Sequence, residues 1–283
     1  MIFGIKQIIK MLFQQLILPV VYNACTAKPV IPGTVILADA HHDEIPFSML
    51  AIKEELSRHP ELQVTEMYWN NNESSPVKIF RNMLSFMKKY ATTETVIICD
   101  NFLPAASCKK RSETQVIQLW HACGAFKKFG YDTEEDIPSY YVGNVMANCS
   151  LVTVSSDICI KPFASAMKLP ETSVLPVGVS RTDMYFNETF NQKCRDNFFS
   201  QYPGGQQEQR KTNFFRKICN IRNTISGHLS PPTLSPDRNT PFVQSRRLAF
   251  PTGNHSSSSF ITSPDFKNNL LGQTFKEKFR QGS

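Results

Sequence analysis

One histidine, His121, stands where an apolar run of strand length gives way to a loop with small and basic residues. The segment 116–130 reads Val-Ile-Gln-Leu-Trp-His-Ala-Cys-Gly-Ala-Phe-Lys-Lys-Phe-Gly. An unperturbed imidazole exchanges its proton near neutral pH, and lysines such as Lys127 and Lys128 can stabilise an anionic group. Ligands of parallel sheets bind outside the carboxyl ends of the strands. The segment therefore predicts a strand that leads into a site, with Gly124 freeing the backbone of the loop.

Carboxylates and two further histidines follow other strand-like runs. Asp39, His41 and His42 come after the first such run, and Asp100 comes after the third. Adjacent histidines point apart in regular structure, so a joint metal site would need an irregular loop. We favour a solvated polar loop at the rim of a cleft and predict no metal site. Asp39 and Asp100 are candidates for contacts with a substrate, although Asp100 could equally cap the next turn.

These candidates need a scaffold, and apolar runs of strand length alternate with helical patterns along the chain. Ser75 followed by Pro76 is a typical helix start. Strands alternating with helices favour an α/β fold with a doubly wound, mostly parallel sheet. The predicted strands cover 34–39, 62–69, 95–100, 116–120, 151–154 and 173–177, and the predicted helices cover 47–58 and 75–89.

The residues around His121 resemble a known motif. Gln118-Leu119-Trp120-His121, followed by Phe126-Lys127-Lys128-Phe129-Gly130, is similar to the Trp-His motif of the CDP-glycerol glycerophosphotransferases, the teichoic-acid polymerase and primase family. The family more often has Trp-His-Gly-Thr-Pro, and Ala122-Cys123-Gly124 stands in place of the last three residues here. The resemblance covers roughly residues 1–200.

Two downstream segments extend this resemblance. Ser155-Ser156-Asp157 is similar to a Ser-Pro-Ser segment of the family, and 178–183, Gly-Val-Ser-Arg-Thr-Asp, is similar to its Gly-Tyr-Pro-Arg-x-Asp segment. The resemblance implies a Rossmann-like sheet that forms the N-terminal half of a GT-B fold. The alternation of strands and helices is in keeping with that fold.

The resemblance also implies a reaction, in which glycerol phosphate moves from CDP-glycerol to a hydroxyl of a membrane-bound acceptor and CMP is released. The attacking alcohol must lose a proton, and we assign His121 as the base. Arg181 could stabilise the phosphoryl group or form a structural ion pair with Asp183, and we weigh these two readings equally. No cofactor is implied. The substrate-binding candidates are Trp120, Gly124, Lys127, Lys128, Arg181, Asp183, Asp39 and Asp100.

The net charge of +7 would suggest an anionic partner, but the charge is not spread evenly over the chain. Of 31 Lys/Arg and 24 Asp/Glu, residues 1–200 hold 19 and 20, leaving 12 and 4 for residues 201–283. The basic excess belongs to the tail, so the folded part gives no argument for nucleic-acid binding. The 8 cysteines form no Cys-x-x-Cys pair, which favours reduced thiols.

Residues 1–25 are predicted to form an amphipathic helix. Ile2, Ile5, Ile9, Leu12 and Leu16 share one helical face, and Pro19 interrupts the pattern. A helix packed on the domain and a cleavable signal peptide are alternatives. We favour an interfacial helix on the cytoplasmic face of the cell membrane, because lysines on the other face could meet anionic headgroups. No apolar run is long enough to predict a transmembrane span.

The composition of the chain changes at about residue 201, after the predicted Rossmann-like acceptor domain of residues 30–200. Segments such as Gly-Gly-Gln-Gln at 204–207 are of low complexity, and apolar periodicity is lost through residues 201–283. We interpret this part as a disordered basic tail that replaces the donor domain of the family, and a frameshift near residue 204 would produce it. On this hypothesis the chain is truncated and inactive alone. The alternatives are a non-catalytic membrane-peripheral remnant and a GT-B enzyme with another nucleotide-activated donor.

Overall fold

A computed structural model describes residues 12–134, 136–137 and 144–202 of the chain. These residues fall into two units. The first covers the described residues up to Phe186, and the second begins at Asn187 and contains helix α7 (Glu188–Gln201). The candidate residues named above all belong to the first unit. The predicted tail lies outside the described residues apart from Gln201 and Tyr202.

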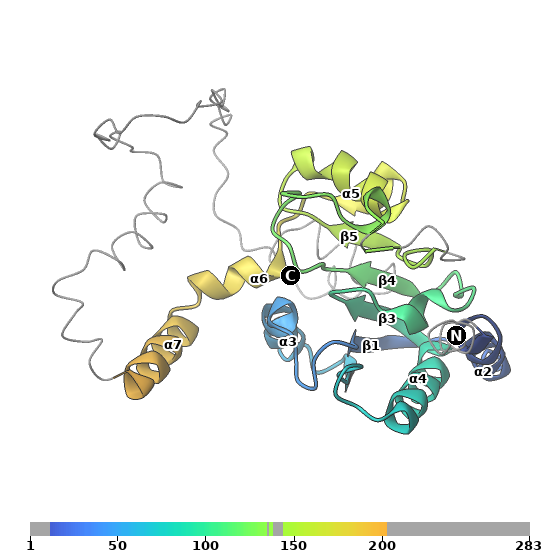
Figure 1. The fold of residues 1–283 in the computed structure, drawn as a ribbon. Coiled ribbons are helices and arrows are strands. Elements are labelled where there is room, and N and C mark those ends of the chain that lie inside the picture. Colours follow the sequence, from blue (N-terminus) through green and yellow to red (C-terminus); the bar gives the residue numbers. More distant parts are fainter. Residues whose placement is uncertain (1–11, 135, 138–143, 203–283) are drawn as a thin grey trace, which may run out of the picture. The chain divides into compact units, whose positions relative to one another are not determined.

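The described part of the first unit contains a parallel sheet of six strands in the order β2-β1-β3-β4-β5-β6. Figure 1 shows β1, β3, β4 and β5 side by side, with helix α4 at the β1 end of the sheet and α5 at the β5 end. The predicted α/β fold is confirmed, and each of the six predicted strands is present. The strands are β1 (Ile31–Asp39), β2 (Gln63–Tyr68), β3 (Thr93–Ile98), β4 (Gln115–Gln118), β5 (Leu151–Thr153) and β6 (Val174–Leu175).

The helices connect these strands, and the ends of several are explained by local sequence. Helix α4 begins where the Ser75 side chain accepts a hydrogen bond from the Lys78 backbone N–H, with Pro76 in the first turn. Helix α5 ends at Lys168, which adopts a left-handed conformation with φ of 50°. The helices of the first unit are α2 (Leu18–Cys25), α3 (Leu50–Leu56), α4 (Pro76–Tyr90), α5 (Ile160–Met167) and α6 (Ser180–Asp183).

The central strands carry continuous apolar runs because both faces of the sheet are covered. Residues 35–39 of β1 and 95–98 of β3 are all buried. An aromatic chain extends this core outward: the Phe102 ring lies 4.8 Å from Phe86 and 5.2 Å from Trp69. Because Phe102 lies two residues after Asp100, this packing fixes the start of the loop that follows β3.

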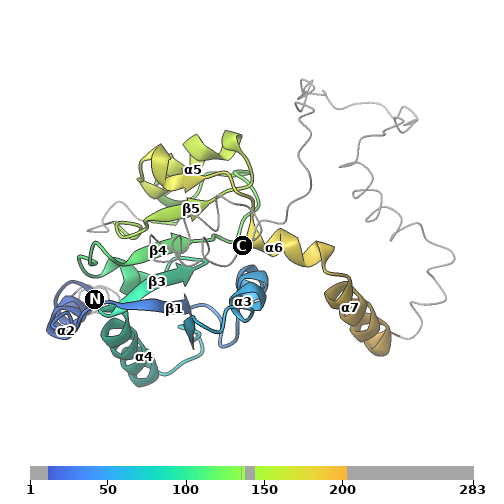
Figure 2. The ribbon, with the colours of Figure 1, turned by 180° about the vertical axis from the view of Figure 1, so that it is seen from behind.

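The N-terminal helix packs on the domain through one face. Leu18 and Tyr22 are fully buried, and the Tyr22 ring lies 5.1 Å from Tyr90 of α4. The hydroxyl of Tyr22 also accepts a hydrogen bond from the Arg111 backbone N–H. Figure 2 shows α2 next to α4, at the opposite end of the strands from α6. Residues 1–11 of the predicted helix lie outside the described residues, and no described helix is long and apolar enough to cross a bilayer.

Pro19 interrupts the apolar pattern of this segment but does not end the helix. It occupies the first turn of α2, and a π-helical turn, Phe13–Ile17, precedes it. In that turn the Leu18 N–H bonds to the Phe13 carbonyl, five residues back. Proline lacks the N–H of a regular helical bond and crowds the preceding turn, so the wider turn lets the chain stay helical through this position.

Candidate active site at the carboxyl edge of the sheet

The candidate residues gather at the carboxyl ends of three neighbouring strands. Asp39 ends β1, Asp100 follows β3, and His121 follows β4. After β1 the chain forms β2 on one side of it, and the later strands β3 to β6 are added in order on the other side of β1. The direction in which strands are added therefore reverses between β1 and β3. Open α/β sheets bind ligands at such a switch point. The sheet therefore places Asp39 and Asp100 beside the position most suited to a ligand.

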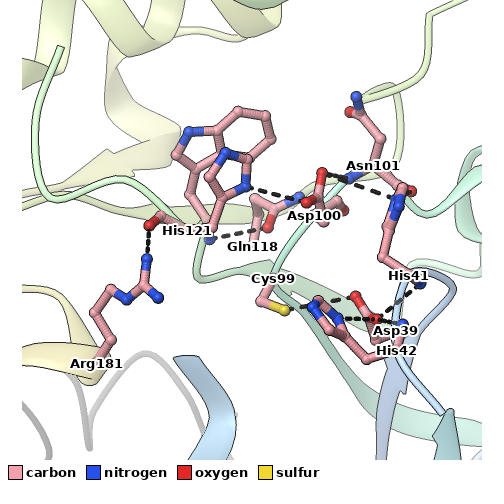
Figure 3. Close-up of polar contacts among 10 residues, drawn as sticks. Asp39, His41, His42, Cys99, Asp100, Asn101, Gln118, His121 and Arg181 are labelled. Carbon is pink, nitrogen blue, oxygen red and sulfur yellow. Dashed lines mark hydrogen bonds and ion pairs between the residues drawn. The ribbon is translucent and has the colours of Figure 1, made fainter. Parts of the chain in front are cut away.

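His121 and Asp100 form a direct pair. Nδ1 of the imidazole lies 3.1 Å from Oδ2 of the carboxylate, as the dashed line in Figure 3 shows. The carboxylate can only accept, so Nδ1 carries a proton, and in the neutral imidazole Nε2 keeps its lone pair. The His121 side chain is 50% exposed, so this ring is not sealed inside the protein. An imidazole held in this way can take a proton from an incoming hydroxyl group.

The charges around the pair act on its protonation. The hydrogen bond that His121 donates to Asp100 raises the pKa of His121, although burial and the charge of Arg181 lower it. Asp136 adds a smaller charge effect that raises the pKa of His121. Burial raises the pKa of Asp100, but the hydrogen bond from His121, the Asn101 N–H and the charge of His121 lower it overall. The carboxylate is therefore ionised at neutral pH and favours a protonated imidazole.

The indole of Trp120 stacks on the imidazole of His121. The Trp120 side chain is 5% exposed and lies 4.5 Å from the His121 ring, at an interplanar angle of 25°. Its backbone has φ of 57°, a left-handed conformation that is uncommon for a bulky residue. The chain therefore turns away from the direction of β4 at Trp120, and the His121 ring comes to lie over the indole. The structure thus places Trp120 in the core beneath the site.

Arg181 comes to the site from helix α6. Its guanidinium donates to the backbone carbonyl oxygen of His121 and lies 5.5 Å from the centre of the Phe47 ring. Of the two readings of Arg181, this contact fits a cation beside the imidazole better than an ion pair with Asp183. Asp183 is the last residue of the same helix and is partly buried.

The two lysines lie on the loop between His121 and Gly130. Lys127 and Lys128 are both exposed, and neither takes part in an ion pair within the part of the chain that the structure describes. Phe126 beside them is 90% exposed. The loop is irregular, and Gly124 lies in it with ordinary backbone angles. Both ammonium groups can therefore reach an anionic ligand, and no contact of the described structure distinguishes them.

Gly130 anchors the far end of this loop. It has φ of 58°, and its N–H donates to the Asp136 carboxylate at 3.0 Å. A Cβ at this position would overlap the backbone carbonyl oxygen of Ala166 in helix α5. The loop that begins at His121 is thus closed against α5 by a position that only glycine fits.

Gly130→Ala is expected to lower the free energy of unfolding by about 2–3 kcal/mol, because the loop must move away from α5. The measurement is the midpoint of thermal unfolding, which should fall by about 4–12 °C. Gly124→Ala is the matched control, since the new Cβ would meet only the exposed Phe126 ring at 3.1 Å, and that ring can turn away. Equal midpoints for the two variants would contradict the anchoring role of Gly130.

Asp39 holds a turn rather than facing a substrate as expected. It is 1% exposed, and its Oδ2 accepts hydrogen bonds from the backbone N–H groups of His41 and His42 and from Nδ1 of His42, at 2.8–2.9 Å. Its Oδ1 accepts from the thiol of Cys99 at 3.7 Å. Burial raises the pKa of that thiol, so the thiol stays protonated as a donor. Asp39 therefore builds the loop after β1, and residues 41–44 of this loop are exposed.

His41 and His42 point toward different carboxylates. Nε2 of His41 lies 3.3 Å from the Asn101 carbonyl oxygen and 4.0 Å from Asp100 Oδ1, whereas His42 binds Asp39. Within the described ranges, no group of three His, Cys, Asp or Glu side chains is arranged to hold a metal ion. The seven described cysteines are free thiols, and Cys219 lies outside the described residues.

Sequence reasoning did not anticipate two features of the site. It offered Asp100 as a substrate contact or a cap of the next turn, and did not foresee that its Oδ2 pairs with His121 while its Oδ1 accepts from the Asn101 N–H. It also gave no role to Gln118, whose side chain is fully buried beneath the pair. A polar residue inside the apolar run of β4 was the available signal, because a buried amide must find partners.

Comparisons with known proteins identify a family that this chain matches. The sequence model of CDP-glycerol:poly(glycerophosphate) glycerophosphotransferases matches residues 20–202, which is more than half of the chain. A teichoic acid ribitol-phosphate primase of Bacillus spizizenii is 30% identical over 182 residues, covering 62% of this chain and 47% of the relative. A teichoic acid glycerol-phosphate primase of Bacillus subtilis is 32% identical over 125 residues, covering 41% of this chain and 31% of the relative.

Among solved structures, one of the wall teichoic acid polymerase TagF aligns with 61% of this chain and 44% of its own, at 15% identity and a TM-score of 0.48. The chain spans about half the length, or less, of the curated relatives it matches. The match to the family model includes the strand ends that carry Asp39, Asp100 and His121 as well as helix α6. Because the family model matches more than half of its residues, the chain belongs to the CDP-glycerol:poly(glycerophosphate) glycerophosphotransferase family.

Proposed function

We propose that this chain carries the acceptor side of a polyol-phosphate transferase of teichoic acid synthesis, and that CDP-glycerol is the donor. The observation that supports the proposal is the His121–Asp100 pair at the carboxyl edge of the sheet, with Nδ1 and Oδ2 3.1 Å apart. The membership of the family supports the class of reaction. The name of the family supports the donor, and the names of the relatives support the polymer.

The reaction makes one bond and breaks one. An acceptor hydroxyl oxygen attacks the phosphorus of the glycerol phosphate group, and Nε2 of His121 takes the hydroxyl proton. The bond between that phosphorus and the bridging oxygen breaks, and CMP leaves with the electron pair. Negative charge on the transferring group needs fixed cations, which supply much of the catalysis in phosphoryl transfer. Arg181 lies beside His121, and Lys127 and Lys128 are exposed on the same loop.

A second donor is supported by one comparison. The primase of Bacillus spizizenii with 30% identity is named for ribitol phosphate, not glycerol phosphate. The His121–Asp100 pair would serve either donor, since it acts on the acceptor hydroxyl. CDP-ribitol therefore belongs in the same assay as CDP-glycerol.

The test is incubation of the full chain with each donor and a lipid-linked acceptor, followed by measurement of CMP. Release of CMP that requires both the donor and the acceptor supports a transferase, and the faster donor identifies the transferred group. A folded chain that releases no CMP from either donor would instead favour a chain that is inactive alone, which the hypothesis of a replaced donor domain predicts, or the alternative of a non-catalytic remnant. Folding is checked by the thermal unfolding transition of the same sample.

We also propose that the N-terminal helix rests on the cytoplasmic face of the cell membrane. Leu12, Leu16 and Val20 lie four residues apart and are 52–61% exposed, on the side of the helix away from buried Leu18. An apolar stripe on a surface helix of this kind is typical of interfacial binding. This placement would bring a lipid-linked acceptor to the protein.

Leu16→Glu is expected to weaken binding of the chain to vesicles that contain anionic lipid by about tenfold, because a charge replaces an apolar contact at the interface. Co-sedimentation with such vesicles measures the effect. Ile158→Glu is the control, since Ile158 is 74% exposed but follows the carboxyl end of β5, whereas α2 lies at the other end of the strands. If both variants bind as the parent chain does, the stripe is not the membrane contact.

A further inference from the structure

Gln118 is a buried amide between the two residues of the active-site pair. It is the last residue of β4, and its side chain is fully buried. Its Nε2 donates to the Asp100 backbone carbonyl at 3.0 Å, and its Oε1 accepts from the Trp120 N–H at 2.9 Å. Figure 3 shows Gln118 beside Asp100 and His121. Both ends of the amide are therefore used, as a buried polar group requires.

These two bonds join the strand ends that carry the pair. One partner is the backbone of Asp100 itself, and the other is the backbone N–H of Trp120, one residue before His121. The bond to Trp120 also holds a left-handed backbone conformation that is unfavourable for a residue with a Cβ. A change at Gln118 would release this turn and the end of β3 together.

The orientation of the amide is fixed by its partners. The Asp100 carbonyl can only accept and the Trp120 N–H can only donate, so the side chain must donate at one end and accept at the other. Glutamate would set a carboxylate oxygen against the Asp100 carbonyl, and methionine would fill the space without either bond. Asparagine keeps the amide but is one methylene too short to reach both partners.

We propose that Gln118 is a positioning residue, which sets the distance and angle between His121 and Asp100 through the two backbones that it joins. Only the expected effect of Gln118 on the rate rests on the proposed function. Its effect on the His121–Asp100 pair can be measured without turnover. The charged groups that act on His121 are Asp100 after β3, Arg181 on α6 and Asp136, and the described hydrogen bonds of the Gln118 side chain go to backbone atoms, not to these side chains. Any effect of Gln118 on the imidazole must therefore pass through the backbone.

The experiment is an NMR titration of the histidine side chains in the full chain and in Gln118→Met. The signal of His121 is assigned by its loss in His121→Asn. In the parent chain the pKa of His121 should lie above the ordinary value for imidazole, because of Asp100. In Gln118→Met it should shift down toward the ordinary value, since the carboxylate is no longer held at the ring. Gln115→Met, at the first residue of β4, is the matched control and should leave the His121 titration unchanged.

A folded Gln118→Met chain in which His121 titrates as in the parent would overturn the proposal and leave Gln118 as a core residue only. If Gln118→Met does not fold, Gln118→Asn is titrated in its place with the same two outcomes. The titration reports on the pair whether or not the chain releases CMP, so its result is separate from the proposed function. Where CMP is released, Gln118→Met should lower kcat by about tenfold and leave KM unchanged, because the acceptor does not touch this buried amide.

Discussion

Replacing His121 with asparagine is expected to lower the rate of CMP release by about 10²–10⁴-fold, the usual contribution of a general base. Asparagine can still donate a hydrogen bond to Asp100, so the loop should keep its shape, but an amide cannot take the proton of the attacking hydroxyl. The loss should appear in kcat, and KM for the acceptor should change little. The measurement is CMP release at saturating donor over a range of acceptor concentrations.

His59→Asn is the control for this change. His59 lies between α3 and β2, at the amino edge of the sheet, and its ring lies near Glu55 and Glu61. The same chemical replacement there should leave the rate unchanged. Retention of the full rate in His121→Asn would remove the base from the mechanism, and the pair with Asp100 would then be a structural contact.

The sheet was predictable from the sequence because its strands are buried on both faces. Runs such as Val35–Ala38 and Val96–Ile98 are apolar without interruption, as is typical of buried parallel strands. The positions of Asp39, Asp100 and His121 at one edge followed from the rule that parallel strands end together. What those side chains touch did not follow, because contacts depend on strand order and on local turns.

Asp100, Pro19 and helix α5 show which features could not be predicted from the sequence. Asp100 faces His121 because β3 and β4 are neighbours in the sheet, and a list of strands does not contain that order. Pro19 lies inside a helix because a π-helical turn precedes it, and helical periodicity of 3.6 residues gives no sign of such a turn. Helix α5 was missed because it has 8 residues and Pro162 near its start, which shortens the periodic pattern.

Asp100→Asn is expected to lower the maximal rate of CMP release by about 10²-fold, since the imidazole is no longer held in the tautomer with a free Nε2. The pH dependence should also change. A base works when it is neutral, so activity is lost as the pH falls through the pKa of His121. The carboxylate raises that pKa, and its removal should therefore shift the acid limb of the pH–rate profile to lower pH.

Stability should respond to the same substitution in a defined pH window. The pKa of His121 is raised by folding, so its contribution is full below the unfolded value of about 6.5 and is lost as pH rises through the folded pKa. The pKa of Asp100 is lowered, so its contribution is full above the unfolded value of about 3.9 and is lost as pH falls through the folded pKa. Asp100→Asn should thus lower the unfolding midpoint most between about pH 4 and 6.5.

Asp43→Asn separates this pair from other carboxylates of the same edge. Asp43 lies in the loop after β1, where it accepts from the Asn70 N–H and lies 3.6 Å from the Lys78 ammonium group. Its replacement should leave both the acid limb and the maximal rate unchanged. A shift of the acid limb in Asp43→Asn equal to that in Asp100→Asn would mean that the general field of the edge sets the pKa of His121. If the acid limb shifts only in Asp100→Asn, the direct hydrogen bond between Asp100 and His121 sets the pKa of His121. A carboxylate in contact with the imidazole acts on its pKa far more strongly than a distant carboxylate does.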